Sequence, residues 1–343
     1  MKSTLRAGGI IILALGLGAF VYYIRLQSKA VRPKPAPAPV APAVPSGPKR
    51  HPPLAFKSND ECKTCHFDIW QECRSDEHSQ AWNNKPLFPQ DPKRTECVSC
   101  HASVPILDHG LDKEIAVRAD RFEEGIGCIE CHKLNDGVNG PLPSIEAPCN
   151  PTFDGRFQTS DTCIPCHAPH GTFEEWKASS WKNKTCQECH MPIVERSSAA
   201  GGPVRKVRSH KFLSARQPEF LQSAVKAEAA FESGTLVIKI TNHNTGHNFP
   251  GEISNREVIL HTRFLNDLGL PIASHRESMQ APPRPQRLDK PTTQIRAGET
   301  RVHRYAPPAE DWRSVRCTIE YKFLSFWHSG VPVWEQTLLR EDK

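Results

Sequence analysis

The chain has 343 residues, of which 44 are Lys or Arg and 38 are Asp or Glu, for a formal net charge of +6. No motif of interleaved basic and aromatic residues accompanies this mild excess, so nucleic acid is not expected as a partner. Thirteen cysteines are present, and their spacing, described below, decides the class of the protein.

The N-terminus carries an apolar segment. A short stretch, residues 1–6, precedes 18 uncharged residues at 7–24. A helix of that length can just cross the roughly 30 Å hydrocarbon core of a bilayer. Tyr22 and Tyr23 lie where an interfacial aromatic belt is expected. We predict an uncleaved transmembrane anchor. A cleaved signal peptide is the alternative, because residues 28–30 form an acceptable cleavage site.

The next segment, residues 25–53, is rich in proline, with nine prolines between Val31 and Pro53. Such a sequence stays extended as polyproline II, at about 3.1 Å per residue. We interpret it as a linker between the anchor and the rest of the chain.

The pentapeptide Cys-x-x-Cys-His then occurs five times between residues 62 and 190. It is the attachment signature of c-type haem, in which two thiols add to the porphyrin vinyl groups and the adjacent His binds the iron. A zinc ribbon or a disulfide framework does not require this His. We therefore predict five covalently attached haems c. The attachment residues are Cys62, Cys65, Cys97, Cys100, Cys128, Cys131, Cys163, Cys166, Cys186 and Cys189. The proximal iron ligands are His66, His101, His132, His167 and His190.

The region that carries these motifs, residues 54–223, has few long apolar runs. Its motifs follow one another every 23 to 35 residues. We therefore predict a pentahaem domain whose interior is formed by porphyrins, with short helices, for example around 67–82 and 172–181.

From residue 224 the apolar period changes to two, which indicates strands. Alternating segments at 225–231 and 236–240 flank the turn Glu232-Ser233-Gly234 and predict a hairpin. Further strands are expected at 257–265, 271–275, 300–305 and 314–323. We predict a β-sandwich-like domain over 224–343, and so an α+β fold class for the whole chain.

Several phrases between and after the haem motifs are distinctive. They are found at residues 69–82, 125–127, 175–192 and 209–212. They resemble the cytochrome c-554 class of multihaem cytochromes, and Gly-His-Asn-Phe-Pro at 246–250 is similar to larger relatives with a C-terminal β domain. The resemblance covers roughly residues 58–325. It implies electron transfer, with His78 and His210 as distal haem ligands.

Sixteen histidines less the five proximal ones leave eleven candidates for five distal positions, so His ligation on both faces of every haem is numerically possible. After His78 and His210, the signature loop offers His247. His109 and His170 lie in Gly- or Pro-flanked loops between motifs. Outside the motifs, a disulfide between Cys73 and Cys149 stays open, and Cys317 is expected to be buried in a strand.

Closely packed low-spin haems pass electrons by tunnelling. We therefore predict a membrane-anchored electron carrier for respiratory partners, with no catalytic residues and more a carrier than an enzyme. Two alternatives remain open. One is a multihaem oxidoreductase that acts on a small nitrogen or sulfur compound at one open haem. The other is a haem subunit of a larger respiratory complex.

Haem chemistry also predicts the location, because bacteria attach haem c outside the cytoplasmic membrane. The expected arrangement is a single-pass protein of the cell inner membrane with its haem domain in the periplasm. The partners expected are the membrane and redox proteins. The haem propionates would bring the net charge close to zero.

Overall fold

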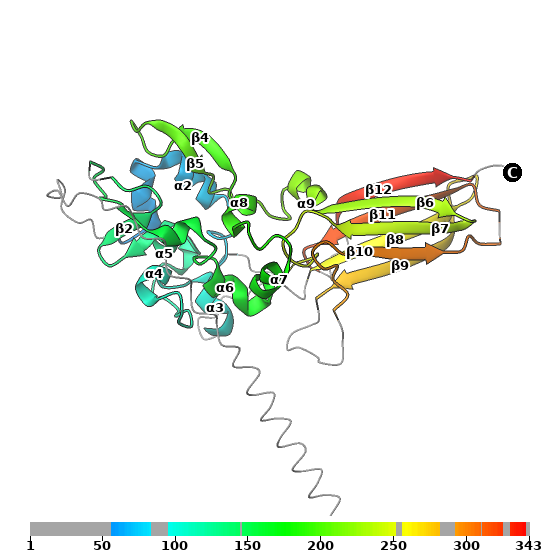
Figure 1. The fold of residues 1–343 in the computed structure, drawn as a ribbon, viewed down its shortest axis with the longest axis horizontal. Helices are drawn as coiled ribbons and strands as arrows, with labels where there is room; N and C mark the ends of the chain where they lie inside the picture. The colour runs from blue at the N-terminus through cyan, green and yellow to red at the C-terminus, as the bar shows by residue number, and fades with distance from the viewer. Residues whose placement is uncertain are drawn as a thin grey trace, which may run out of the picture. The chain divides into compact units, whose positions relative to one another are not determined.

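The computed structural model of this protein is shown in Figure 1. The residues that it describes are 56–83, 95–144, 146–251, 256–281, 292–309, 311–324 and 330–340. The predicted anchor at 7–24 and linker at 25–53 lie outside them. Among the residues just given, no helix combines the length and apolarity needed to cross a membrane.

By its internal contacts the chain divides into Met1–Pro37 and Ala38–Lys343, and all described residues belong to the second unit. The predicted boundary between residues 223 and 224 stays a prediction. The mixed composition of helices followed by strands, which the α+β class requires, is confirmed.

The region of the motifs is built from short helices. Helices α2 and α7 begin where they were predicted. Both are shorter than expected, since the predicted stretches extended to Trp82 and Trp181. The α-helices are α2 (Phe67–Arg74), α3 (Thr95–His101), α4 (Ile106–His109), α5 (Cys128–His132), α6 (Ile164–His167), α7 (Thr172–Ala178), α8 (Cys186–His190) and α9 (Pro218–Ala224). The 3₁₀ helices are η1 (Asn59–Thr64), η2 (Phe122–Glu124), η3 (Gly155–Gln158) and η4 (Ala168–His170).

Two small sheets accompany these helices. One has the order β1-β2-β3, with β1 (Lys133–Leu134), β2 (Gly137–Gly140) and β3 (Thr152–Phe153). The other is an antiparallel hairpin of β4 (Ile193–Ser197) and β5 (Val204–Arg208). Apolar side chains form two small buried clusters here, of three residues each. Side chains alone therefore supply little interior, as the sequence predicts for a region filled by porphyrins.

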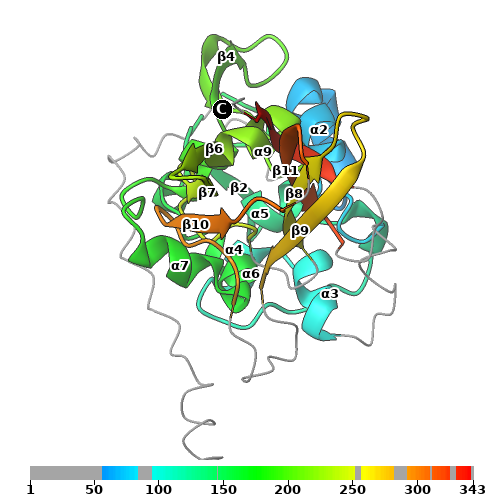
Figure 2. The same ribbon diagram turned by 90° about the vertical axis from the view of Figure 1, so that its right-hand side faces the viewer.

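The C-terminal strands form two antiparallel sheets, seen nearly along their strands in Figure 2. The first has the order β10-β7-β6, with β6 (Val225–Glu232), β7 (Thr235–Asn242) and β10 (Thr300–Tyr305). The second has the order β12-β11-β8-β9, with β8 (Glu257–Leu265), β9 (Pro271–Gln280), β11 (Ser314–Lys322) and β12 (Val331–Leu339). The predicted hairpin is confirmed, and Ser233 and Gly234 take positive φ in its turn.

One apolar core is shared by the two sheets. Strand β7 alternates toward it, so that Leu236, Ile238 and Ile240 are fully buried. Strands β8 and β11 contribute Leu260 and Ile319 from the other sheet. This is the packing of a sandwich, in which each sheet covers the apolar face of the other. The same core contains Cys317, which is buried as predicted.

A loop after β7 is held against this core. The buried amide of Asn242 donates from Nδ2 to the carbonyl oxygens of His247, at 2.9 Å, and of Ile295, at 3.0 Å. Phe249, two residues after His247, is buried beside the ring of Tyr321. The signature loop therefore presents His247 from a fixed position at the end of a strand.

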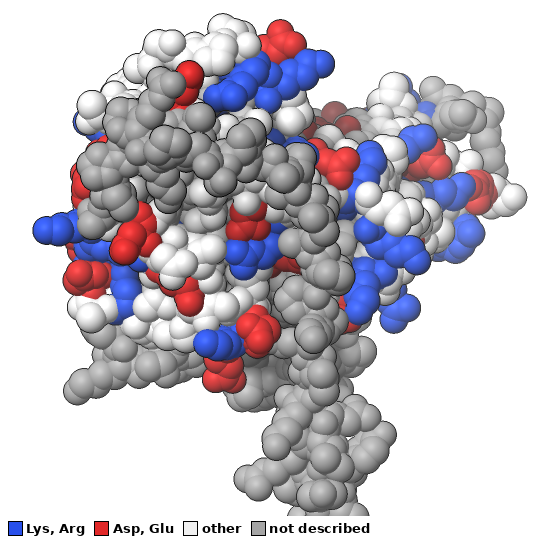
Figure 3. Space-filling model, turned by 60° about the vertical axis from the view of Figure 1, so that its left-hand side comes forward, with Lys and Arg blue, Asp and Glu red and all other residues white. Residues whose placement is uncertain are grey.

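Charged side chains are mixed on the face shown in Figure 3, where Asp and Glu alternate with Lys and Arg over the region of the motifs. Several of these charges are paired, for example Lys133 with Asp108 at 2.6 Å.

Candidate functional site

Each Cys-x-x-Cys-His motif folds as about one helical turn. Three motifs lie within α3, α5 and α8, and the fourth lies in α6 with Cys163 as its N-cap; each of these helices ends at the proximal His. The first motif spans the end of η1 and the two residues before α2. Positions i, i+3 and i+4 share one face of a helix. Local structure therefore places both thiols and the imidazole of a motif on the same side.

The rings of four proximal histidines are held through Nδ1. His132 bonds to the carbonyl oxygen of Asn139 at 2.7 Å, and His190 to that of Leu213 at 2.6 Å. The corresponding partners are Ser198 for His66, at 2.5 Å, and Ala81 for His101, at 2.9 Å. A carbonyl oxygen only accepts, so Nδ1 carries the proton and Nε2 is the nitrogen that can ligate iron.

Three predicted distal histidines face three different proximal ones. The ring centres of His132 and His210 are 6.1 Å apart, and those of His78 and His167 are 6.2 Å apart. The third pair, His190 and His247, is at 6.4 Å. Two imidazoles on opposite sides of one metal ion, each nitrogen about 2 Å away, have ring centres about 6 Å apart. The side chains of these three pairs therefore fit bis-His haem.

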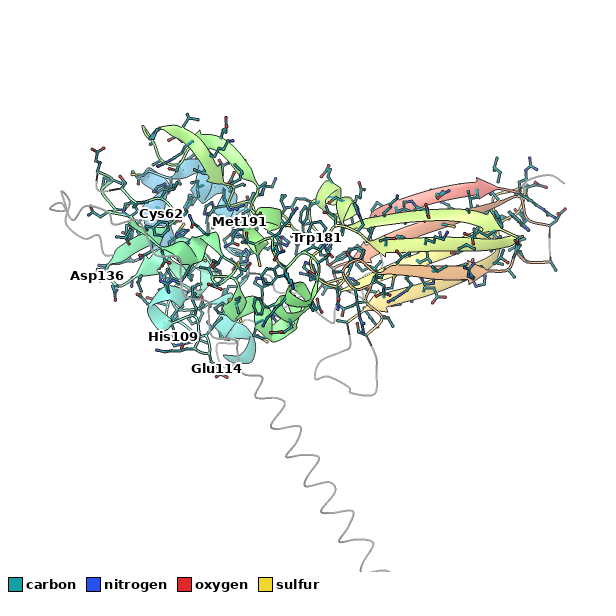
Figure 4. All side chains as sticks on the ribbon, in the orientation of Figure 1. Cys62, His109, Glu114, Asp136, Trp181 and Met191 are labelled. Carbon is teal, nitrogen blue, oxygen red and sulfur yellow. The ribbon has the colours of Figure 1, made fainter. Side chains whose placement is uncertain are left out.

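The other two candidates are placed differently. His109 ends α4, and its Nε2 bonds to the carbonyl oxygen of Glu114 at 2.6 Å; Figure 4 labels both residues. This contact occupies the nitrogen that the proximal rings direct to iron. His170 ends η4, three residues after His167. Their role as distal ligands stays a prediction, as do the second axial ligands opposite His66 and His101.

Carboxylates hold the segments that carry the distal histidines. Oδ1 of Asp76 accepts from Nδ1 of His78 at 2.8 Å. Oε2 of Glu72 accepts from the backbone N–H of His210 at 2.8 Å and from Arg196. Burial alone would raise the pKa of Glu72, but these two donors hold it below its usual value. Burial lowers the pKa of His210 to about 4, which keeps the ring neutral at neutral pH, as a ligand must be.

The loop of His247 is secured in the same way. Glu175, in α7, accepts from the backbone N–H of Asn248 at 3.0 Å and from its Nδ2 at 2.8 Å. In the sequence, the segment around Glu175 was notable only because it resembles the cytochrome c-554 class. The hydrogen bonds of Glu175 with Asn248 give this segment a physical role. The strand region thus provides a candidate ligand that the region of the motifs holds in place.

Cysteine side chains from different motifs lie next to one another. Cys163 is within hydrogen-bonding distance of Cys186, and Cys166 is within hydrogen-bonding distance of Cys100. The fourth motif therefore adjoins the second and the fifth. By the same contact, between Cys62 and Cys128, the first motif adjoins the third.

A buried network of charged residues around Glu130 was not predicted from the sequence. Glu130, inside the third motif, is fully buried and contacts Arg118 at 3.4 Å and Arg121 at 3.2 Å. Its Oε2 also accepts from Nδ2 of Asn59, at 2.9 Å, and from the N–H of Gly127, at 2.9 Å. A buried carboxylate needs such partners to offset its desolvation. A charged residue within a Cys-x-x-Cys spacing was the available signal.

The same network joins the first motif to the third. Glu124 accepts from Oγ of Ser58 at 2.8 Å, from the N–H of Asn59 at 3.0 Å and from Arg121 at 3.0 Å. Oδ1 of Asn59 accepts from the N–H of Ile129 at 2.7 Å. These bonds fix the position of one haem-binding peptide relative to the other.

No disulfide joins Cys73 and Cys149: both are thiols, Cys73 buried and Cys149 half-buried. The disulfide that the sequence left open is therefore not formed in this structure.

Comparisons with known proteins agree with the geometry. Residues 157–195 match the family described as doubled CXXCH motif. The fold is similar to the crystal structure of a penta-heme cytochrome c552 from Thermochromatium tepidum, with a TM-score of 0.64. The two sequences are 18% identical over 84% of this chain and 100% of that one. A glycoside hydrolase family 2 beta-glucuronidase matches only at a TM-score of 0.19, with 13% identity over 34% of this chain and 11% of that one, and carries no argument. Among curated proteins, none matches the sequence.

Proposed function

We propose that this multihaem c-type cytochrome carries electrons between redox partner proteins through haems that are closed by His on both faces. Its class and its covalently attached haem c follow from the doubled motif and the likeness of fold, and its five motifs agree in number with the penta-heme neighbour. The observation that carries the proposal is the set of three His ring pairs at 6.1 to 6.4 Å.

The side chains have defined tasks in this function. Haem c supplies a one-electron couple. In the three ring pairs, His78, His210 and His247 would hold the haem together with His167, His132 and His190, and would keep a substrate away from the iron. The carbonyl partners of Nδ1, such as Asn139 for His132, hold each ring in one tautomer and orientation, so that ligation needs little rearrangement when the charge changes.

The neighbouring motifs support a continuous route. The first motif adjoins the third, and the fourth adjoins the second and the fifth. Cys131 of the third motif interacts electrostatically with Cys163 of the fourth. These neighbours support a row of closely spaced haems, as stepwise electron tunnelling requires.

Location is part of the proposal. Residues 7–24 would anchor the chain once in the cell inner membrane, and the Pro-rich residues 25–53 would extend into the periplasm. What supports this is the sequence of those segments together with the export needed for haem attachment. Such a tether would let the haem domain meet membrane-bound and soluble redox partners, including a larger respiratory complex.

The alternative is catalysis on a small nitrogen or sulfur compound at a haem with an open axial position. The ring pairs support a second His ligand at the haems of His132, His167 and His190, which argues against an open position at those three. An open iron would be high-spin and would bind exogenous ligands, so spectroscopy separates the two functions.

The test uses the full chain, purified in detergent after expression with haem maturation. Mass spectrometry should give five haems, and the ferric spectrum should be low-spin throughout. Carbon monoxide should leave the ferrous spectrum unchanged. A high-spin component that binds the gas would replace the carrier function by catalysis at that iron. The matched variant for an engineered open site is His210→Ala, which should bind carbon monoxide at one haem.

A further inference from the structure

The imidazole of His78 differs from the other candidate ligands in the partner of its Nδ1. Six candidates bond Nδ1 to a backbone carbonyl oxygen; they are His66, His101, His132, His190, His210 and His247. His78 instead bonds to the carboxylate of Asp76, at 2.8 Å. A neutral oxygen is thus exchanged for an anionic one at this position.

The carboxylate is shielded from water, which strengthens its effect. The side chain of Asp76 is 2% exposed. Electrostatic interactions are several-fold stronger at a buried site than at the surface, because the effective dielectric constant is lower. A hydrogen bond to an ionised acceptor is also roughly twice as strong as one between neutral groups.

The turn around His78 is rigid. Oδ1 of Asp76 also accepts from the backbone N–H of His78 at 3.0 Å. The carbonyl oxygen of His78 accepts from the N–H of Ile126 at 2.8 Å. Gly125, with φ +61°, lies so close to the backbone of His78 and Ser79 that no Cβ would fit there. The pairing of Asp76 with the ring is therefore built into the fold and does not depend on a mobile side chain.

We propose that Asp76 is a positioning residue that lowers the reduction potential of the haem bound between His167 and His78. The inference rests on the proposed function. A carboxylate that accepts the Nδ1 proton increases the electron donation of the imidazole to iron. The ferric state, with one more positive charge, is stabilised more than the ferrous state, so the haem accepts an electron less readily.

The test is a redox titration of holoprotein, followed by absorbance and by electron paramagnetic resonance of the low-spin ferric signals. Asp76→Asn keeps the size of the side chain and removes its charge. It should raise the potential of one haem by about 59 mV, a tenfold change in its ratio of ferric to ferrous forms at a given potential.

Two further variants identify the haem and control for charge. His78→Met identifies the haem. It changes one axial ligand, so the low-spin ferric signal that it alters belongs to the iron bound by residue 78. Asp154→Asn removes another poorly exposed carboxylate, one that pairs with Arg156 at 2.5 Å. It should leave the haem marked by His78→Met unshifted.

The outcomes are distinct. A shift confined to the marked haem in Asp76→Asn, with all signals still low-spin, supports the inference. No shift, or an equal shift of that haem in Asp154→Asn, overturns it. A high-spin signal in Asp76→Asn also overturns it, since Asp76 would then only hold the ligand in place. Failure of the proposed function would show already in the unsubstituted protein, as missing or high-spin haems.

Discussion

The region of the motifs and the strand region build their interiors from different materials. In the strand region, twenty buried residues from both sheets, helix α9 and the adjoining loops form one apolar cluster. Around the motifs, the apolar clusters contain three buried residues each, and the other organised interior is a network of charges. Burial of apolar side chains can stabilise the strand region by itself. The region of the motifs depends on the group attached to it.

The largest effect should come from removing one haem. Cys128→Ala with Cys131→Ala should leave four haems and unfold much of the region of the motifs, because cofactor binding and folding are coupled in such sites. Limited proteolysis should then degrade residues 56–223 and spare a fragment of the strand region. Cys317→Ala, a cysteine outside the motifs, is the control and should keep all five haems. Equal protection of the two regions in the double variant would contradict the comparison.

A second prediction tests the strand region from its core. Ile319 is fully buried, and Ile319→Ala should lower the free energy of unfolding of the strands by about 2–5 kcal/mol. Denaturation followed by far-ultraviolet circular dichroism should detect this loss before the haem absorbance of the first four motifs changes. Val302→Ala, at a position that is 43% exposed, should change the free energy by less than about 0.5 kcal/mol. If the circular dichroism of the strands and the haem absorbance changed at the same denaturation midpoint, the two regions would unfold as a single cooperative unit, contrary to this prediction.

A third prediction concerns the contact between the regions. His247→Ala should convert one haem, that of the fifth motif, to a high-spin form that binds carbon monoxide. The remaining haems should stay low-spin. His243, in the same loop and exposed, provides the matched control, and His243→Ala should leave every spectrum unchanged. If His247→Ala were spectroscopically silent, the pair with His190 would not ligate one iron.

The smallest effect should come from the charge network. Burial opposes ionisation of Glu124, but donors from Asn59, Ser58 and Arg121 hold its pKa below the usual value. A depressed pKa contributes stability above the unfolded pKa, and this is lost as pH falls through the folded pKa. Glu124→Gln should therefore cost roughly 1 kcal/mol at pH 7 and little in strong acid. Denaturant titrations at both pH values measure the difference, with Glu123→Gln, at the exposed neighbour, as control.

Local patterns in the sequence were enough to predict the elements that local physics determines. The spacing of Cys62, Cys65 and His66 defines one haem site within five residues. Strict alternation with Ser233-Gly234 between the two runs predicted β6 and β7, and β8 and β10 were predicted with the bounds observed. In these cases neighbours in sequence decide the structure.

Elsewhere, tertiary contacts decide. Strand β12 was missed because Pro332 interrupts its pattern; Pro is tolerated there because β12 lies at the edge of its sheet. Strand β9 continues beyond the predicted His275 to Gln280; Arg276 and Glu277 are exposed in this extension, and Met279 is buried in the core shared by the two sheets. The pairing of His78 with His167 joins residues far apart in the chain. No spacing rule reports such a partner, and the resemblance named His78 without naming its haem.

The position of His247 sets an order of events during biosynthesis. It follows all five motifs in the chain, and its loop is fastened to the core by Asn242 and Phe249. If His247 ligates the iron of the fifth motif, as proposed above, that iron can reach its final coordination only after the C-terminal strands have folded. A chain whose strands had not folded would then keep one haem without its second axial ligand.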